Sequence, residues 1–451
     1  MEILSLRLYW RCLALFILSQ FSLSVSTASE AFYIVLENRC QMLTRLYIKA
    51  HTDHVAKYKM YVVESNSSKT IGLFELQPYH IWVNLHGHWH QLHLKPHHRY
   101  IGADWMSVFG VTLQPKTYID WHWWNPFPSF TLLFCPEWIE LQKSRLFYGM
   151  DRVIFLGDSL SDKGTLHKYT FGRVPKSPPY YNGVFSNGRP WTVRLAEALH
   201  PHRIYAENYA VGGATVRWRL WPTLPYSLNF QIDAYLLNHT EMHDHGRHVV
   251  FILLGANDYL MGKYTRSQVD EITTETIATI QTEVDRLLRS GVRRFVIIGL
   301  PDLGLTPKAK KSGVSQDMNS ISLAHNRKLH TMVERYRLQY TQLDYHFHYI
   351  DVFTMLHELL KKHSRINKQY RLAISNFSDP CWKRGYTDYS VRSPKDKQVE
   401  VLTSEICLHP DHYLFWDEMH PTQIIHDLLY RYILNQLDIK IQKSTDKIEV
   451  C

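Results

Sequence analysis

From residue 153 onward, short apolar runs alternate along the chain with segments whose apolar residues recur at helical intervals. The runs Val153–Leu156, His248–Leu254 and Arg294–Leu300 are apolar almost throughout, which is typical of strands buried on both faces. Ser267–Leu288 is one of the helical segments, with Ser267 as its predicted N-cap and Gly291 as its stop. Because strands and helices alternate, the pattern predicts an α/β domain with a parallel sheet covered on both faces.

The same pattern predicts the remaining elements of this part of the chain. Strands are expected at 207–211 and 346–353, and helices at 192–199, 230–237, 320–340 and 422–437. A long polar loop at 168–190 separates the first strand from the helix that follows it.

The region before residue 150 has a different pattern, in which strand-like runs are separated by polar stretches. Such runs occur at 31–36, 58–63, 80–85 and 107–113. More than half of the chain's 13 tryptophans fall in this region. We therefore expect a small β-rich domain at 29–145, a catalytic domain at 150–440 and a C-terminal tail at 441–451.

Two features of this first region have alternative interpretations. His86, His88 and His90 share one face of a predicted strand, either as metal ligands or as a polar solvent face. The aromatic loop at 121–128 either dips into a membrane interface or packs in the core.

Residues 1–28 are typical of an export signal. Arg7 and Arg11 precede an apolar run, and the small residues Ser26-Thr27-Ala28 predict cleavage after Ala28. The apolar run is shorter than the roughly 20 residues that a membrane span requires. The protein is therefore expected to be secreted.

The net charge of +9, together with 27 histidines, favours contact with anionic surfaces. The cations are dispersed, and the longest cluster, Lys308-Ala-Lys310-Lys311, is typical of a solvated loop or helix start. Peripheral contact with a membrane surface is thus expected, and nucleic acid is not an expected partner.

Removal of the signal would leave five cysteines, namely Cys40, Cys135, Cys381, Cys407 and Cys451. Secretion permits disulfides. Cys381 and Cys407 lie in one polar insertion, and Cys40 and Cys135 flank the aromatic region. Each pair would close a loop, and the two pairs together would leave Cys451 over; the alternative is that all five are free thiols.

Three apolar strand-like runs end at a small or amide residue. Ser159 follows the first, Gly213 the second and Asn257 the third. Adjacent parallel strands bring such ends together at one edge of a sheet. The backbone N–H groups of Ser159 and Gly213 and the side-chain amide of Asn257 would then stabilise an oxyanion formed when Ser159 attacks an ester.

A fourth feature lies near the C-terminus, where Asp417 precedes His420 by three residues. His420 would take the proton of Ser159, and Asp417 would orient the imidazole and stabilise its cation. Each feature alone also fits an ordinary strand–helix junction or a chance pair. Their combination in this order favours a serine hydrolase, which requires no metal or organic cofactor. Asp158 is expected to cap the following helix rather than to react.

This combination resembles the GDSL, or SGNH, hydrolase superfamily. The four matching blocks are Gly157-Asp158-Ser159-Leu160, Gly213, Gly255-Ala-Asn257-Asp258 and Asp417-x-x-His420. Longer matches resemble secreted bacterial phospholipases of the thermolabile haemolysin and glycerophospholipid–cholesterol acyltransferase group. These longer matches are 155–162, 187–191, 210–214, 378–381 and 415–421.

The resemblance implies a flavodoxin-like three-layer sandwich with a central parallel sheet. It implies hydrolysis of acyl esters in phospholipids or lysophospholipids, or acyl transfer to a sterol, and a Cys381–Cys407 disulfide. The loop at 176–181 and the His-rich N-terminal region depart from the family pattern. Because of these departures, a carbohydrate O-acetylesterase and a catalytically inactive lipid- or glycan-binding module are the alternatives.

Overall fold

The computed structural model describes residues 139–141, 144–217, 226–240, 245–260, 267–370, 372–385 and 405–441 in full, and only the backbone of the strand residues outside these ranges. The chain divides into two compact units, residues 1–136 with 444–451, and residues 137–443. The predicted signal, Cys40, Cys135, Cys451, His86, the loop at 121–128 and the run at 107–113 lie outside the described residues.

The first unit contains two four-stranded sheets, with strand orders β17-β7-β1-β4 and β3-β2-β5-β6. Their strands are β1 (Ala31–Asn38), β2 (Thr44–Ala50), β3 (Lys59–Val63), β4 (Ser67–Glu75), β5 (Tyr79–Leu85), β6 (His88–Leu94), β7 (Ser129–Phe134) and β17 (Ile448–Val450). β17 comes from the other end of the chain and pairs antiparallel with β7.

The second unit is built on a five-stranded sheet in which all pairs are parallel. Its strands are β9 (Arg152–Gly157), β10 (Tyr205–Asn208), β11 (His248–Leu253), β12 (Arg294–Ile298) and β13 (His346–Ile350). Their order in space is β10-β9-β11-β12-β13. In order of sequence this is 2-1-3-4-5, the flavodoxin-like arrangement. The predicted α/β fold with a central parallel sheet is confirmed.

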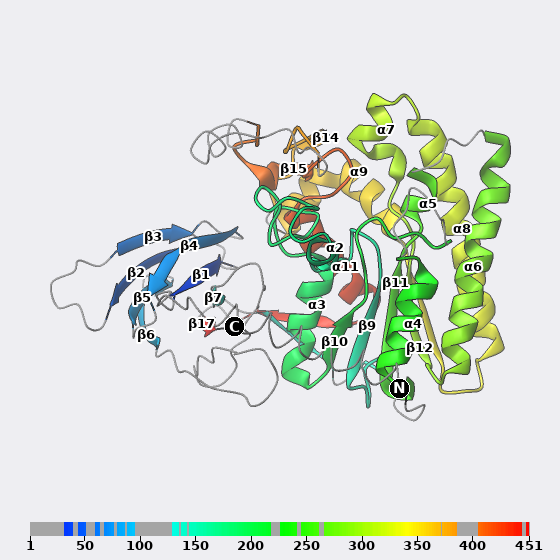
Figure 1. The fold of residues 1–451 in the computed structure, drawn as a ribbon, viewed down its shortest axis with the longest axis horizontal. Coiled ribbons are helices and arrows are strands. Elements are labelled where there is room, and N and C mark those ends of the chain that lie inside the picture. The colour runs from blue at the N-terminus through cyan, green and yellow to red at the C-terminus, as the bar shows by residue number, and fades with distance from the viewer. Residues whose placement is uncertain are drawn as a thin grey trace, which may run out of the picture. The chain divides into compact units, whose positions relative to one another are not determined.

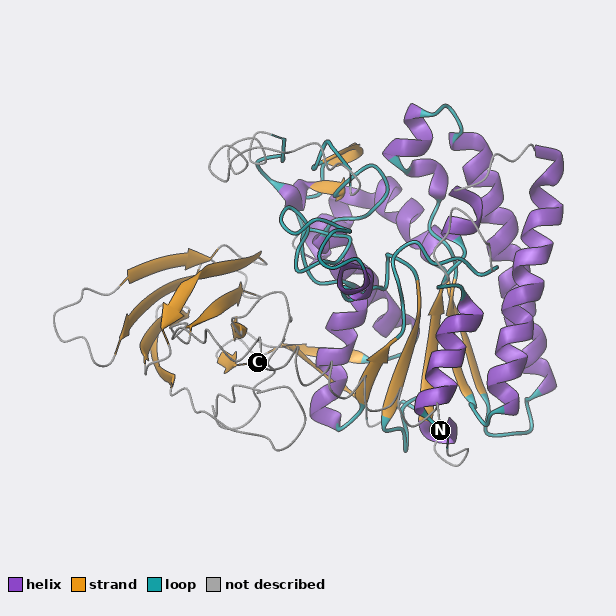
Figure 2. Ribbon diagram, viewed as in Figure 1, coloured by secondary structure: helices purple, strands orange, loops and turns teal. Residues whose placement is uncertain are grey.

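Helices cover both faces of this sheet. Successive side chains of a strand point to opposite faces, and in β9, β11 and β12 most side chains on both faces are apolar and need burial. Val153 and Phe155 of β9 join a buried cluster with α3 (Trp191–Leu199), α9 (Val352–Tyr370) and α11 (Gln423–Gln436). Ile154 and Leu156 join a second cluster with α4 (Leu228–Asn238), α6 (Val269–Arg289) and α8 (Ser315–Gln339). Figure 2 shows the strands between these two helical layers.

Shorter elements complete the second unit, among them a strand pair formed by the two ends of the unit, β8 and β16. They are β8 (Glu137–Glu140), α2 (Thr165–Tyr169), η1 (His200–His202), η2 (His245–Arg247), α5 (Ala256–Leu260), η3 (Arg266–Gln268), η4 (Leu303–Leu305), α7 (Pro307–Lys311), β14 (Asn376–Pro380), η5 (Pro410–His412), β15 (Tyr413–Phe415) and β16 (Lys440–Lys443). A search of the described helices finds no segment that is both long and apolar enough to cross a bilayer.

Several predicted boundaries differ from the structure, among them those of the strand expected at 207–211, which is β10, and of the helix expected at 320–340, which is α8. The strand expected at 346–353 ends at Ile350, because the Asp351 carboxylate accepts the backbone N–H of Thr354 and so begins the unpredicted helix α9. The helix expected from Ser267 begins at Val269, with Gln268 in the N-cap position after a 3₁₀ turn.

Candidate active site

Ser159 lies just beyond the carboxyl end of β9, at the point where the strand order reverses between β9 and β11. Gly157 is required at the end of this strand, because a Cβ there would lie 2.8 Å from the Leu253 carbonyl oxygen. The chain then turns sharply, with the N–H groups of Ser161 and Asp162 both donating to the carbonyl oxygen of Asp158. The turn leaves Ser159 half-buried at the edge of the sheet.

The structure brings Ser159, His420 and Asp417 together in a hydrogen-bonded chain. Nε2 of His420 lies 3.0 Å from Oγ of Ser159, and Nδ1 lies 2.7 Å from Oδ2 of Asp417. With Nδ1 protonated, His420 donates to Asp417, and Nε2 accepts from the Ser159 hydroxyl. This arrangement satisfies the distances that a nucleophile, its general base and an orienting carboxylate require.

Asp417 is fully buried and accepts four hydrogen bonds. Oδ1 accepts the backbone N–H groups of Met419 and His420, and Oδ2 accepts Nδ1–H of His420 and the hydroxyl of Tyr180 at 2.6 Å. Burial raises the pKa of this carboxyl, but the charge of His420 and the hydrogen bonds bring the pKa below its ordinary value. Asp417 is therefore a carboxylate at neutral pH.

The predicted oxyanion donors also lie around this edge of the sheet. Gly213 has φ +79°, and a Cβ there would meet no atom within 4 Å, so its backbone faces open space. Asn257 is buried, and its Nδ2 donates one hydrogen bond to the Ala214 carbonyl at 2.9 Å, which orients the amide. Within the described part of the chain, the N–H groups of Ser159 and Gly213 donate to no acceptor.

A pocket that is partly open to solvent adjoins these groups. Ser159, Asn257 and His420 lie in its wall. Most of the other lining side chains are apolar, and they include Leu160, Leu253, Leu260, Leu303, Val352, Met355, Leu356, Leu414, Phe415, Ile425 and Leu429.

Asp158 was predicted to cap the helix after the nucleophile, but a second aspartate, Asp162, binds the start of that helix instead. Asp158 does not cap α2; its Oδ1 accepts the N–H of Leu160, and burial raises its pKa to about 7. Gly164 occupies the N-cap position, and the carboxylate of Asp162 accepts the N–H groups of Gly164, Thr165 and Leu166. The prediction for Asp158 was wrong because seven residues separate the end of β9 from the start of α2 at Thr165, which places Asp158 too far from the helix to cap it.

Asp162 also ties two predicted site segments together, since its Oδ2 accepts the N–H of Gly212 at 2.8 Å. Asp258 does the same for the next segment by accepting the N–H groups of Val216 and Arg217. Tyr180, which bonds Asp417, was missed because the polar loop around it has no periodicity that would place its side chain.

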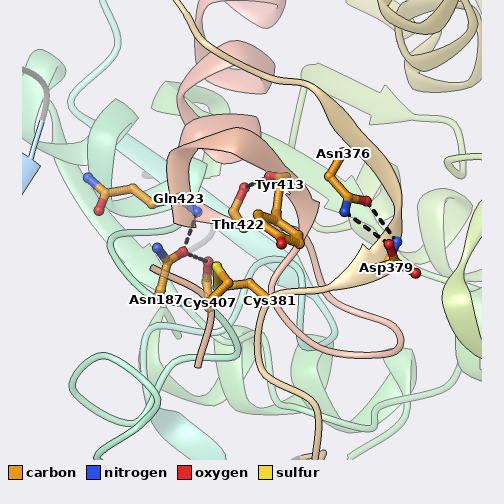
Figure 3. Close-up of a disulfide and its surroundings, with 9 residues drawn as sticks. Asn187, Asn376, Asp379, Cys381, Cys407, Tyr413, Thr422 and Gln423 are labelled. Atoms are coloured by element: carbon orange, nitrogen blue, oxygen red, sulfur yellow. Dashed lines mark hydrogen bonds between the residues drawn. A yellow bond between two sulfur atoms is a disulfide. The ribbon is translucent and has the colours of Figure 1, made fainter. Parts of the chain in front are cut away.

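Cys381 and Cys407 are joined by a disulfide beside the strand that leads to Asp417. The N–H of Cys381 donates to the Phe415 carbonyl, and that of Trp382 donates to the Trp416 carbonyl. Figure 3 shows the disulfide near the start of α11, where Asn187 Oδ1 accepts the N–H of Gln423 at 2.7 Å. The insertion therefore borders the segment that carries Asp417 and His420.

Metal binding has no support among the described side chains. No group of three or more histidine, cysteine, aspartate or glutamate side chains within the described ranges could hold a metal ion. The side chains of His88 and His90 lie outside those ranges, so the metal and solvent-face interpretations both stay open.

Comparison with curated proteins finds bacterial relatives. Secreted effector protein SseJ of Salmonella typhimurium is 29% identical over 287 residues, covering 61% of this chain and 60% of that protein. Phosphatidylcholine-sterol acyltransferase of Aeromonas hydrophila is 25% identical over 312 residues, with 62% and 87% covered. Thermolabile hemolysin of Vibrio parahaemolyticus is 26% identical over 293 residues, with 64% and 63% covered.

A solved acetyl xylan esterase, AlAXEase, shares 14% identity at a TM-score of 0.35, covering 63% of this chain and 98% of that one, a likeness too weak to bear on function. The model of the family described as GDSL-like lipase/acylhydrolase matches residues 153–433, well over half of the chain. This match spans the central sheet except for Arg152, together with Ser159 and His420. The chain therefore belongs to the GDSL-like lipase/acylhydrolase family.

Proposed function

We propose that the protein is a serine esterase that cleaves long acyl chains from phospholipids or lysophospholipids. The observation that carries this proposal is the apolar pocket that adjoins Ser159 and His420. A pocket lined by leucines, isoleucine, valine and methionine suits an acyl chain, because each methylene removed from water contributes about 0.8 kcal/mol of binding energy. An acetyl group would leave most of this apolar wall in contact with water.

The proposed reaction begins with the attack of Ser159 Oγ on the ester carbonyl while His420 Nε2 takes the hydroxyl proton. Asp417 stabilises the resulting imidazolium, and the N–H groups of Ser159 and Gly213 with the Asn257 amide stabilise the oxyanion. His420 then returns the proton to the departing alcohol, which leaves an acyl-Ser159 ester. Water, or a sterol hydroxyl, attacks this ester by the same route and restores Ser159.

Three features of this proposal come from similarity. The relative from Aeromonas hydrophila is named a phosphatidylcholine-sterol acyltransferase, which favours phospholipid as acyl donor and a sterol as one acceptor. The relative from Salmonella typhimurium is named a secreted effector. We propose that this chain is likewise exported, by the segment 1–28.

A labelling experiment tests the chemistry. A fluorophosphonate should attach to Ser159 of the full chain, and Ser159→Ala should remain unlabelled, as found by peptide mass spectrometry. Absence of label on the intact chain would favour an inactive binding module.

A series of esters from acetyl to palmitoyl tests the substrate class. Rates that rise with acyl length support the apolar pocket as the acyl site. A maximum at acetyl would favour the carbohydrate O-acetylesterase instead.

A further inference from the structure

An aromatic and basic surface lies beside the candidate active site, on the segment 163–176, which we call the α2 loop. The side chain of Tyr169 is 55% exposed, and that of Phe171 is 71% exposed. Figure 1 shows α2 at the same end of the central sheet as α5, the helix that carries Asn257. This is the edge at which Ser159 lies.

The backbone of the α2 loop holds Phe171 in an unfavourable conformation. Phe171 has φ +54°, in the left-handed region that bulky residues rarely adopt. Thr170 fixes the turn, since its Oγ1 donates to the Leu166 carbonyl and accepts the N–H of Val174. Although this backbone conformation costs energy, it leaves most of the Phe171 side chain exposed to solvent, where its ring can contact a surface outside the protein.

All Asp, Glu, Lys and Arg residues in this segment of the sequence are basic ones. Between residues 163 and 196 the sequence contains no aspartate or glutamate, whereas the α2 loop contains Lys163, Lys168, Arg173 and Lys176. Exposed aromatic rings next to cations are the groups that settle at the headgroup level of an anionic bilayer. A protein partner would need complementary acidic groups instead, without a specific use for the protruding ring.

The α2 loop is also packed against the site itself. Leu166 shares a small buried cluster with Phe185 and Val211. The ring of Phe185 lies 4.9 Å from the ring of His420, centroid to centroid. One layer of side chains therefore separates the aromatic surface from the proposed general base.

We propose that the α2 loop is the membrane-contacting surface, which inserts Tyr169 and Phe171 among the headgroups of an anionic phospholipid bilayer while Lys168, Arg173 and Lys176 contact the lipid phosphates. It brings the lipid ester to the edge of the sheet where Ser159 lies. The proposal rests on the proposed function only in taking phospholipid as the substrate.

Vesicle binding tests this surface in the full chain carrying Ser159→Ala, which cannot consume the lipid. The probes are vesicles of phosphatidylcholine with and without phosphatidylglycerol. Phe171→Asn suits the test because asparagine tolerates positive φ, so the turn should be kept. We expect it to weaken binding to the mixed vesicles about tenfold.

The control is Leu338→Asn, which alters a 76% exposed apolar side chain near the carboxyl end of α8, before β13 and so at the opposite edge of the sheet. It should leave binding unchanged. Arg173→Gln and Lys176→Gln should each weaken binding at low salt about fivefold, and only to vesicles that contain phosphatidylglycerol. The proposal would be overturned if Phe171→Asn bound the vesicles as tightly as the chain with Phe171 unchanged. It would also be overturned if Phe171→Asn and Leu338→Asn weakened vesicle binding equally.

Turnover separates this proposal from the proposed function. With Ser159 intact, Phe171→Asn should hydrolyse a water-soluble butyryl ester at the normal rate and vesicle phospholipid about tenfold more slowly. Loss of vesicle binding in a chain that hydrolyses no ester would support the membrane surface and reject the esterase. Normal vesicle hydrolysis by Phe171→Asn would reject the surface and leave the esterase standing.

Discussion

At the scale of single residues, the state of Asp417 depends on a neighbour from a distant loop. Tyr180 is buried, its hydroxyl donates to Asp417 Oδ2, and its ring packs edge-on against Trp416 at 6.2 Å. Asp417 Oδ2 therefore serves two donors, Tyr180 and His420. A hydrogen bond to a charged group contributes about 1.5–3 kcal/mol, more than a neutral one.

Tyr180→Phe should lower kcat/KM for a soluble ester about tenfold, because Asp417 loses a donor that stabilises its charged form. The pKa of Asp417, now below its ordinary value, should rise. Initial rates of the two chains on the soluble ester at pH 8 check this loss. Tyr181→Phe is the control, and an unchanged kcat/KM in Tyr180→Phe would contradict the role.

Asp158 gives a second prediction, because its pKa is raised whereas that of Asp417 is lowered. Its folded-state pKa of about 7 lies above the ordinary 3.8, so the native protein binds more protons than the unfolded one between these values. This carboxyl thus costs the fold increasing stability as pH rises from 4 to 7. Asp158→Asn should be more stable than the parent chain at pH 8, on the order of a few kcal/mol, and nearly equal at pH 4. Urea unfolding across this range tests it, and a constant difference would count against it.

At the scale of elements, two helices hold the ends of central strands through one amide side chain each. Gln231 of α4 accepts the N–H of Gly157 and donates to its carbonyl, both at 2.8 Å. Asn326 of α8 makes the same pair of bonds to Leu300, just after β12. The strand ends need these partners because a buried backbone group without one is costly.

Gln231→Ala should destabilise the catalytic unit by about 2–4 kcal/mol, since the N–H of Gly157 loses its acceptor in the core. It should also lower esterase activity, because Gly157 positions the turn that carries Ser159. Gln281→Ala on α6 is the matched control and should change stability by less than about 0.5 kcal/mol. Similar urea midpoints for the two variants would disprove the role of Gln231.

At the scale of the whole molecule, the second unit is closed by its own two ends. β8 and β16 pair antiparallel, and Ile139 and Ile439 beside them are buried in the core cluster with α3 and α11. Leu146 and Phe147 join the same cluster. The folded boundary of the unit thus lies at 137–443.

We predict that residues 137–443 fold alone and hydrolyse a soluble ester at the rate of the full chain. A fragment of residues 150–440 should be less stable by several kcal/mol, because it lacks the buried Ile139, Leu146 and Phe147, each worth about 1.5–3 kcal/mol. Thermal unfolding of the two fragments compares them directly. Equal stability would show that the strand pair is dispensable.

The sequence by itself determined the alternation of strands and helices and the residues that end the strands, because periodicity and small or amide residues are local signals. It also determined the family, whose blocks around Ser159, Gly213, Asn257 and His420 are short and contiguous. The family model and the parallel sheet confirm the predicted family and fold class. The catalytic and oxyanion roles of these residues stay proposals.

Only the tertiary structure decided what surrounds those residues. Hydrogen bonds join Tyr180 to Asp417 and Gln231 to Gly157, although these residues lie far apart in the sequence. The burial of Asp158 and the exposure of Phe171 likewise depend on segments that no local pattern connects. Each depends on which side chains meet after the sheet has formed, and on how much water is left between them. Such contacts follow from packing in three dimensions, which a periodicity along the chain does not encode.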